Sequence, residues 1–428
     1  MKRREFIKAA VALPFVGAVG AGIAADPGAA GHPMVGKRLP PWKRGEFQVH
    51  FIYTGVGESM FWIMPDGTTM LLDCGDHPAI ARGKFAVWVL PNGKRHAGEW
   101  VARYVERVNP SGKDVDYLMI SHHHADHAGM TGWGAGEREW NGRKLSVSGV
   151  VQAADFLKFK TCFDRGWPNF DDPIPDERCN ELAYRHLRDA FAYLAERDGL
   201  RMERFEVGAV NQVALRDAAA FPGFSVTNIA GNGKIRRRDG SVRDLYAEMH
   251  DAKRLNENGM SLGLVAQYGS FRFYTAGDFF DVFRLPDGTR RDIEAELAKE
   301  TDPVDVAKVN HHGHHSMNQP LVAALRARVW TACIWDQLHV TADTLERLSS
   351  RDAYPGPRLI APGVFPPERR MEDAGRPFLA DIAPESFAAG HVVLTVAPGG
   401  ATYTIAYVMA DNESMKVTGA YDFVSNRG

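Results

Sequence analysis

Several features are scarce in this sequence. Net charge is close to zero, with 51 basic against 53 acidic residues. Without an excess of Lys and Arg, the composition does not favour a long polyanion such as DNA as a partner. Cysteine is also scarce, at four in 428 residues, and no pair has the CxxC spacing of a cysteine metal site. Beyond residue 30 no run of eighteen apolar residues occurs, so we expect no membrane span in the mature protein.

The first thirty residues are expected to lie outside the fold. They begin with Lys2, Arg3 and Arg4 and continue as a small, apolar stretch over residues 9–25, which is typical of an export signal. The paired arginines, followed by Phe6, resemble a twin-arginine signal. The alternative is a membrane anchor, but the Gly- and Ala-rich stretch is hardly long enough. We therefore expect cleavage near residues 24–30, export in the folded state by the twin-arginine machinery, and a periplasmic or secreted protein.

The predicted compartment is oxidising and permits disulfide bonds. Cys162 and Cys179 flank a Pro- and Asp-rich segment and could pair, whereas Cys74 and Cys333 lie in apolar contexts and are expected to be small buried hydrophobes.

The rest of the chain predicts one large domain. Residues 31–45 are rich in Gly, Pro and basic residues and indicate a linker; residues 46–410 form the domain, with a long elaboration at about 130–255, and residues 411–428 form a C-terminal tail. Apolar runs predict strands at 47–53, 60–64, 69–73, 115–120, 261–268, 271–276, 304–310, 329–335, 391–397 and 401–408. Helical spacing predicts helices at 99–108, 179–197, 319–327 and 342–350. Strands in hairpins followed by strands alternating with helices indicate mixed sheets with helices outside.

The most informative segment is Ser-His-His-His-Ala-Asp-His-Ala-Gly at residues 121–129. It follows the predicted strand 115–120. Alternate residues such as His122 and His124 point to the same side, and two imidazoles make half of a tetrahedral zinc site. Asp126 and His127 are offset and can hold a second metal. The alternative is a polar loop with incidental histidines, but clustering at metal-ligand spacing argues against it.

Four motifs together resemble the metallo-β-lactamase superfamily: residues 71–75 (Leu-Leu-Asp-Cys-Gly), the His-x-His-x-Asp-His element at 122–127, Gly277-Asp278 and residues 311–313 (His-His-Gly). With Asn258-x-x-Ser261 ahead of the last two, they resemble the branch that contains the ComEC-type hydrolase domains and the phosphorylcholine esterases. The similarity covers roughly residues 47–130 and 255–410. It implies an α/β fold: a four-layer αββα sandwich with a long insertion, with the metals at one edge between the sheets.

The resemblance also implies roles for single residues. His122 and His124 would bind the first metal, and Asp126 and His127 the second. Asp278 would bridge both, because a carboxylate has two oxygens; alone, it would read as a turn aspartate.

The resemblance implies roles for four further residues. His312 would be the last ligand of the second metal, and the neighbouring His311 would hydrogen-bond to substrate. The two histidines could also have these roles the other way round. Asp73 would orient a ligand, or else cap the turn at residue 75. His339 is either a substrate contact or a helix-start histidine without a role.

The sequence departs from the superfamily at the first metal. Many members supply a third histidine between the cluster and the bridging aspartate, and only His186 and His250 lie in that interval here. His186 falls in a predicted helix, His250 is expected at the surface, and Asn258 stands where that histidine is expected in the resembling branch. The first metal is therefore short of one ligand.

These residues predict a metal-dependent hydrolase. Zinc lowers the pKa of a bound water to about 7 and so supplies a metal-bound hydroxide. One or two Zn²⁺ ions are expected, while the nitrogen and oxygen ligands would also accept Mn²⁺ or iron. Asp126 is expected to take the proton of the attacking water, and His311 or His339 to stabilise developing negative charge.

The expected substrate is a phosphodiester or related ester, either a small molecule or part of the cell envelope. A β-lactam hydrolase, a nuclease and a non-catalytic metal-binding receptor are the alternatives. Four aromatic residues of the elaboration could line a substrate pocket or just pack it: Trp133, Trp140, Trp167 and Phe170.

Overall fold

We describe the protein from a computed structural model, which covers residues 31–78, 87–173, 181–248, 256–280, 282–284 and 287–426. The predicted export signal, His250 and Cys179 lie outside the described residues. Within them, no helix is both long and apolar enough to cross a membrane.

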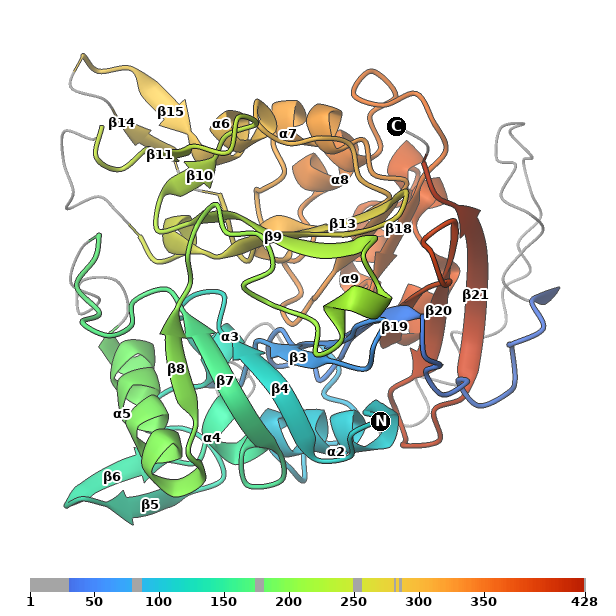
Figure 1. Ribbon diagram of the computed structural model, residues 1–428. Coiled ribbons are helices and arrows are strands. Elements are labelled where there is room, and N and C mark those ends of the chain that lie inside the picture. The colour runs from blue at the N-terminus through green and yellow to red at the C-terminus, as the bar shows by residue number, and fades with distance from the viewer. Residues whose placement is uncertain are drawn as a thin grey trace.

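Two large sheets form the centre of the molecule (Figure 1). The nine-stranded sheet has the order β21 (Val417–Val424), β20 (Thr402–Met409), β19 (Gly390–Val396), β1 (Phe47–Phe51), β2 (Met60–Ile63), β3 (Thr69–Leu72), β4 (Asp114–Met119), β7 (Lys158–Asp164) and β8 (Arg201–Arg204). The eight-stranded sheet has the order β11 (Val242–Asp244), β10 (Lys234–Arg236), β9 (Phe224–Gly231), β12 (Gly263–Tyr268), β13 (Phe271–Thr275), β16 (Val306–Lys308), β17 (Val329–Ala332) and β18 (Leu359–Pro362). Each sheet contains a parallel half, β3-β4-β7-β8 in the first and β13-β16-β17-β18 in the second.

Helices cover the outer faces of the two sheets (Figure 1). The described helices are α2 (Ala97–Val108), α3 (Ala125–Ala128), α4 (Gly149–Ala153), α5 (Glu181–Asp198), α6 (Ile293–Ala298), α7 (Gln319–Leu325), α8 (Ala342–Leu348) and α9 (Pro367–Glu372). Two small hairpins, β5 (Glu137–Trp140) with β6 (Arg143–Ser146) and β14 (Val282–Arg284) with β15 (Arg290–Asp292), stand apart from the sheets.

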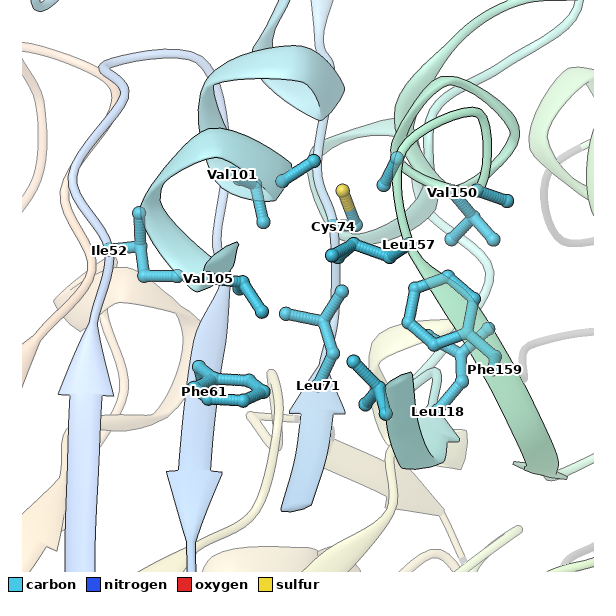
Figure 2. Packing of buried hydrophobic residues seen from close by; sticks show 14 of the residues in the cluster. Ile52, Phe61, Leu71, Cys74, Val101, Val105, Leu118, Val150, Leu157 and Phe159 are labelled. Atoms are coloured by element: carbon cyan, nitrogen blue, oxygen red, sulfur yellow. The ribbon is translucent and has the colours of Figure 1, made fainter. Parts of the chain in front are cut away.

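Strand alternation divides the core into three layers of apolar side chains. Phe61 and Leu71 point outward and pack against Val101 and Val105 of α2 (Figure 2). Their neighbours in sequence point inward, where Trp62 packs edge-on against Phe273 of the second sheet. On the far side, the second sheet packs against α6, α7 and α8. The αββα sandwich that the sequence predicts is therefore confirmed.

The predicted strands and helices are found, most of them one to three residues shorter at one end. The hairpin across residues 65–67 is confirmed: β2 and β3 pair antiparallel, with Ile63 opposite Thr69. The strand before the histidine cluster is β4, and the predicted helix at 179–197 is α5. The strand predicted at 304–310 shortens to Val306–Lys308 because the chain turns sharply at the paired histidines.

Three boundary predictions need correction. Residues 130–255 are not simply an elaboration, since they supply β7 and β8 to one sheet and β9, β10 and β11 to the other. Residues 411–428 are not a tail, because β21 pairs along β20 and forms the edge of the first sheet. Residues 31–45 are not a free linker either: Gly36 N donates to Val417 O, and Val417 N donates to Lys37 O. In each case backbone groups of an apparently irregular segment complete a sheet edge.

The described cysteines are buried free thiols: Cys74, Cys162 and Cys333. Cys162 lies on β7 within the apolar cluster under α5, and its predicted partner lies outside the described residues.

Candidate metal centre

The predicted ligands converge because the parallel strands of both sheets end at the same edge. β3 leads into Asp73, and β4 leads into the histidine cluster and the short helix α3. From the second sheet, β13 leads into Gly277 and Asp278, and β16 leads into the paired histidines. Carboxyl ends of parallel strands are the usual place for a site in such sheets, and here two sheets present those ends to one another.

Four of these side chains enclose one point. Nε2 of His312 lies 3.0 Å from Asp126 Oδ2, 3.3 Å from Asp278 Oδ2 and 3.3 Å from His127 Nε2. His127 Nε2 lies 3.2 Å from Asp278 Oδ2 and 3.7 Å from Asp126 Oδ2. Donors about 2.0–2.1 Å from a tetrahedral zinc stand about 3.3–3.4 Å apart. The two imidazoles and two carboxylates therefore fit one divalent cation of zinc size.

A second group of donors adjoins the first through Asp278. His122 Nε2 lies 3.0 Å from His124 Nδ1 and 3.8 Å from Asp278 Oδ2. The third imidazole that many superfamily members have does not come from His186, which is buried in α5 with its Nε2 3.2 Å from the carbonyl of Ser148. This group thus offers two imidazoles and a shared carboxylate.

Asp73 fixes the orientation of the cluster. Its carboxylate accepts hydrogen bonds from the backbone N–H of Ser121 at 2.7 Å and from Nδ1 of His127 at 2.8 Å. A hydrogen bond at Nδ1 leaves the Nε2 lone pair of an imidazole for a metal. His312 is oriented in the same way, since its Nδ1 donates to the carbonyl of Cys333 at 2.8 Å.

The paired histidines have different surroundings. His311 uses both ring nitrogens: Nδ1 donates to His314 O at 2.9 Å, and Nε2 lies 3.2 Å from Nδ2 of Asn258. Only His312 therefore presents a nitrogen to the donor group. Both residues have positive φ, 48° and 51°, a strained turn that is held by Glu294, whose carboxylate accepts from Met317 N at 2.9 Å and from the next backbone N–H.

His339 and Trp335 lie over the centre. The ring of His339 stacks on that of His312 with centroids 4.9 Å apart, and Trp335 lies edge-on to the same ring at 5.8 Å. Phe280 stacks on His311 at 4.9 Å. Aromatic side chains therefore border the metal ligands on the side of the second sheet.

The centre attracts positive charge. Although burial acts to lower it, the nearby carboxylates of Asp278 and Asp126 raise the pKa of His312 to about 9. Burial opposes the same effect at His127, whose pKa is nevertheless raised well above its usual value by Asp278, Asp73 and Asp126. At both imidazoles the surrounding carboxylates thus outweigh the effect of burial, an electrostatic setting that favours a bound cation.

Two buried charged residues adjoin the centre, although no motif in the sequence indicated them. Glu58, between β1 and β2, and Lys308, at the end of β16, are fully buried, with Nζ and Oε2 2.8 Å apart. Glu58 belongs to a group with His127, Asp278 and His312 whose ligand atoms all lie within 4.8 Å of one another. One signal was available: Lys308 stands between Ala307 and Val309 in a buried strand, where a lysine needs a buried partner.

The aromatic residues of the elaboration pack against neighbouring side chains and do not line a substrate pocket. Trp133 donates from Nε1 to Asp76 at 3.1 Å. Trp140 packs edge-on against Tyr193, and Trp167 packs edge-on against Phe170, all in contact with the cluster under α2, α4 and α5.

Comparison with known proteins agrees with this geometry. Residues 53–140 match the model of the metallo-beta-lactamase superfamily. The matched segment contains β2, β3 and β4 with Asp73 and the histidine cluster, and it supports assignment to that superfamily. Together with the donor group, it supports a metal-dependent hydrolase in general terms. No curated protein matches the sequence.

Two solved structures are weakly similar to this chain. One is a diiron beta-hydroxylase, CmlA, from Streptomyces venezuelae, at 10% identity and a TM-score of 0.34, covering 74% of this chain. This chain spans 49% of that protein. The other is a metal-dependent hydrolase of the beta-lactamase superfamily, at 13% identity and a TM-score of 0.34, covering 73% of this chain and 95% of the other.

Proposed function

We propose that the protein is an exported, metal-dependent hydrolase that cleaves a phosphodiester or a related ester. The observation that carries the proposal is the convergence of Asp126, His127, Asp278 and His312. The Nε2 atoms of the two histidines lie 3.3 Å apart, and each lies 3.0–3.7 Å from a carboxylate oxygen of both aspartates. These residues would hold a zinc ion, which would supply Lewis acidity and lower the pKa of a water molecule. The residues fit one such ion fully and a second, at His122 and His124, less completely.

The protein's own side chains have separate tasks in this proposal. Asp126 lies at the rim of the donor group, 3.0 Å from His312 Nε2, where its carboxylate can take a proton from the attacking water. Asp73 holds His127 in the tautomer that faces the cation. His339 borders the centre, where its ring can donate a hydrogen bond to a developing negative charge. Both ring nitrogens of His311 are already engaged by His314 O and Asn258 Nδ2, so this task falls to His339.

The charge of the site supports a substrate of low charge. Among the described residues, Lys308 is the one Lys or Arg that lies within 4 Å of Asp126 or Asp278, and Glu58 neutralises it. A phosphate monoester with two negative charges would lack cationic side chains to bind its oxygens. A phosphodiester has one negative charge and a carboxylic ester has none. The metal cation alone can therefore bind the oxygens of either substrate. The bordering rings of Trp335 and Phe280 suit an apolar or aromatic leaving group.

The test combines metal analysis with a substrate panel. Protein purified from its own compartment is expected to contain one or two zinc ions per chain and to hydrolyse chromogenic phosphodiesters or carboxylic esters. Asp126→Ala should lose that activity, and nitrocefin and plasmid DNA complete the panel. A protein that contains zinc but cleaves no member of the panel would contradict the proposal and favour a metal-binding receptor; cleavage of nitrocefin alone would favour a β-lactam hydrolase.

A further inference from the structure

The buried pair of Glu58 and Lys308 has no role in the function proposed above. Both side chains are fully buried, and Lys308 Nζ lies 2.8 Å from Glu58 Oε2. A buried ion pair costs much desolvation free energy and contributes little net stability. The pair also joins the two sheets, because Glu58 follows β1 and Lys308 ends β16. Its position therefore calls for a reason other than stability.

Each member of the pair is attached to a segment that carries a metal ligand. Lys308 Nζ donates to the carbonyl of Gly277 at 2.8 Å and lies 3.8 Å from Asp278 Oδ1. Glu58 Oε2 lies 3.4 Å from Nδ1 of His312. The backbone N–H of Glu58 donates to the carbonyl of Asp126 at 2.7 Å. The side chains of the pair thus contact His312 and the Gly277–Asp278 turn, and the backbone of Glu58 contacts Asp126.

Glu58 itself could be taken for a ligand, since it lies close to His127, Asp278 and His312. Two observations favour a supporting position. Its Oε2 already faces the ammonium of Lys308, and a metal ion on the same oxygen would be repelled by that charge. It also approaches His312 at Nδ1, whereas the donor group gathers at Nε2 of that ring.

We propose that Glu58 is a positioning residue of the metal centre. Paired with Lys308, it holds His312 and the Gly277–Asp278 turn in place, and it cancels the positive charge of an ammonium that would otherwise stand beside the cation. The inference rests on the function proposed above, because it concerns the same metal centre.

The experiment measures zinc affinity of the full, metal-free protein by competition with a chromophoric chelator. Glu58→Gln should weaken binding by about 10- to 100-fold, because the amide leaves the ammonium uncompensated. The double variant Glu58→Gln with Lys308→Met removes both charges and should recover much of that loss. Arg358→Met is the control: Arg358 is a buried cation that donates to the carbonyls of Leu348 and Gly356, away from the ligands. It should lower the melting temperature and leave zinc affinity unchanged.

Three outcomes would overturn the inference. One is a Glu58→Gln protein whose affinity stays within about twofold of wild type. Another is a double variant that recovers none of the zinc affinity lost in Glu58→Gln, as expected if the loss came from removing a ligand oxygen, Oε1 of Glu58, rather than from an uncompensated ammonium. If Glu58→Gln does not fold, the double variant is compared with His312→Ala, since neutral replacement of a buried pair is often tolerated. Affinity of the double variant as low as that of His312→Ala would then be decisive against the inference.

A spectroscopic measurement separates positioning from general destabilisation. The absorption spectrum of the Co²⁺-loaded protein reports ligand geometry, so it should change in Glu58→Gln and remain unchanged in Arg358→Met. Zinc affinity does not depend on turnover. If wild-type protein binds zinc but hydrolyses no substrate, the proposed function fails while the comparison of these variants still stands.

Discussion

Asp73 Oδ2 lies 2.8 Å from Nδ1 of His127, and the same oxygen accepts a hydrogen bond from Ser121 Oγ at 2.7 Å. One carboxylate at the end of β3 thus sets the tautomer of a ligand on α3 and holds the residue that begins the histidine cluster. Asp73 itself has a positive φ of 62°, a conformation that Asp and Asn tolerate better than most residues.

This relationship predicts the effect of Asp73→Asn. The amide keeps the size of the side chain and tolerates the backbone conformation, but it no longer accepts with the strength of a carboxylate. We expect zinc affinity to fall by about 10- to 100-fold, as is usual for the residue that orients a metal-bound histidine. Competition with a chromophoric chelator measures this zinc affinity. The matched control is Asp76→Asn, a buried aspartate nearby that accepts from Trp133 and Ser148; equal losses in both variants would contradict a specific role for Asp73.

A second prediction concerns Asp278, the carboxylate that both donor groups share. Zinc at 100 times its dissociation constant should stabilise the wild-type protein by about 2.7 kcal/mol. Asp278→Ala should abolish this stabilisation, because it opens both groups at once. His122→Ala should retain most of it, since Asp126, His127, Asp278 and His312 remain. Thermal unfolding with and without zinc distinguishes them, and equal responses of the two variants would show that Asp278 is not shared.

A third prediction concerns the turn that presents Asp278. Gly277 has a φ of +50°, and a Cβ there would lie 2.8 Å from the side chain of Ser261, whose Oγ accepts from Asp278 N at 2.9 Å. Gly277→Ala should therefore displace Asp278 and weaken zinc binding as well as lower stability. Gly112→Ala is the control, since that residue has a similar φ of +67° with open space around it. It should cost only about 1–2 kcal/mol of stability, and a similar loss of zinc binding in both would argue against displacement.

A fourth prediction concerns pH and lies away from the metal. Burial lowers the pKa of His50 to about 3, and burial together with His50 and Arg107 lowers the pKa of His391 to about 3. The unfolded chain, with histidine pKa values of about 6.5, binds these protons more tightly. Stability is therefore full above about pH 6.5 and declines as the pH falls toward 3, by about 2 kcal/mol for each histidine at pH 5.

The check is urea unfolding at pH 7.5 and pH 5 for wild type and His50→Gln. Glutamine does not titrate and can bond to the neighbours of His50, which are Tyr104 Oη at 3.0 Å and Gln48 Oε1 at 3.2 Å. The variant should lose about 2 kcal/mol less between the two pH values. An unchanged loss would mean that His50 is protonated in the folded protein.

The sandwich was predictable because its strands carry strong local signals. Apolar runs bounded by turns located β2, β3, β4, β12, β13 and β17, and the ordered motifs placed the ligands at strand ends. β21 was missed although Val417, Ala420 and Phe423 are buried, since the strand follows what looked like the last hairpin. Strands β7 and β8 were missed because Lys, Arg and Glu interrupt their apolar pattern. Such strands take their conformation from neighbouring strands, which a single sequence does not display.

The site was predictable only where residues form a motif. The spacing of the histidine cluster alone predicts four metal ligands: His122, His124, Asp126 and His127. The sequence gives no such signal for Glu58, because this residue stands alone in a loop. Its role depends on contact with Lys308, which lies on the other sheet. Partnerships between the sheets depend on the three-dimensional arrangement, and no period or spacing in the chain encodes them.

Asp126 and His312 are separated by 186 positions in the chain, yet their side chains lie 3.0 Å apart. A nascent polypeptide that has already made its histidine-rich stretch therefore cannot trap a cation securely until the second sheet has been synthesised and has docked on the first. A metal ion bound at this centre would therefore be captured late in folding, and it would link two halves of the domain that are synthesised at different times.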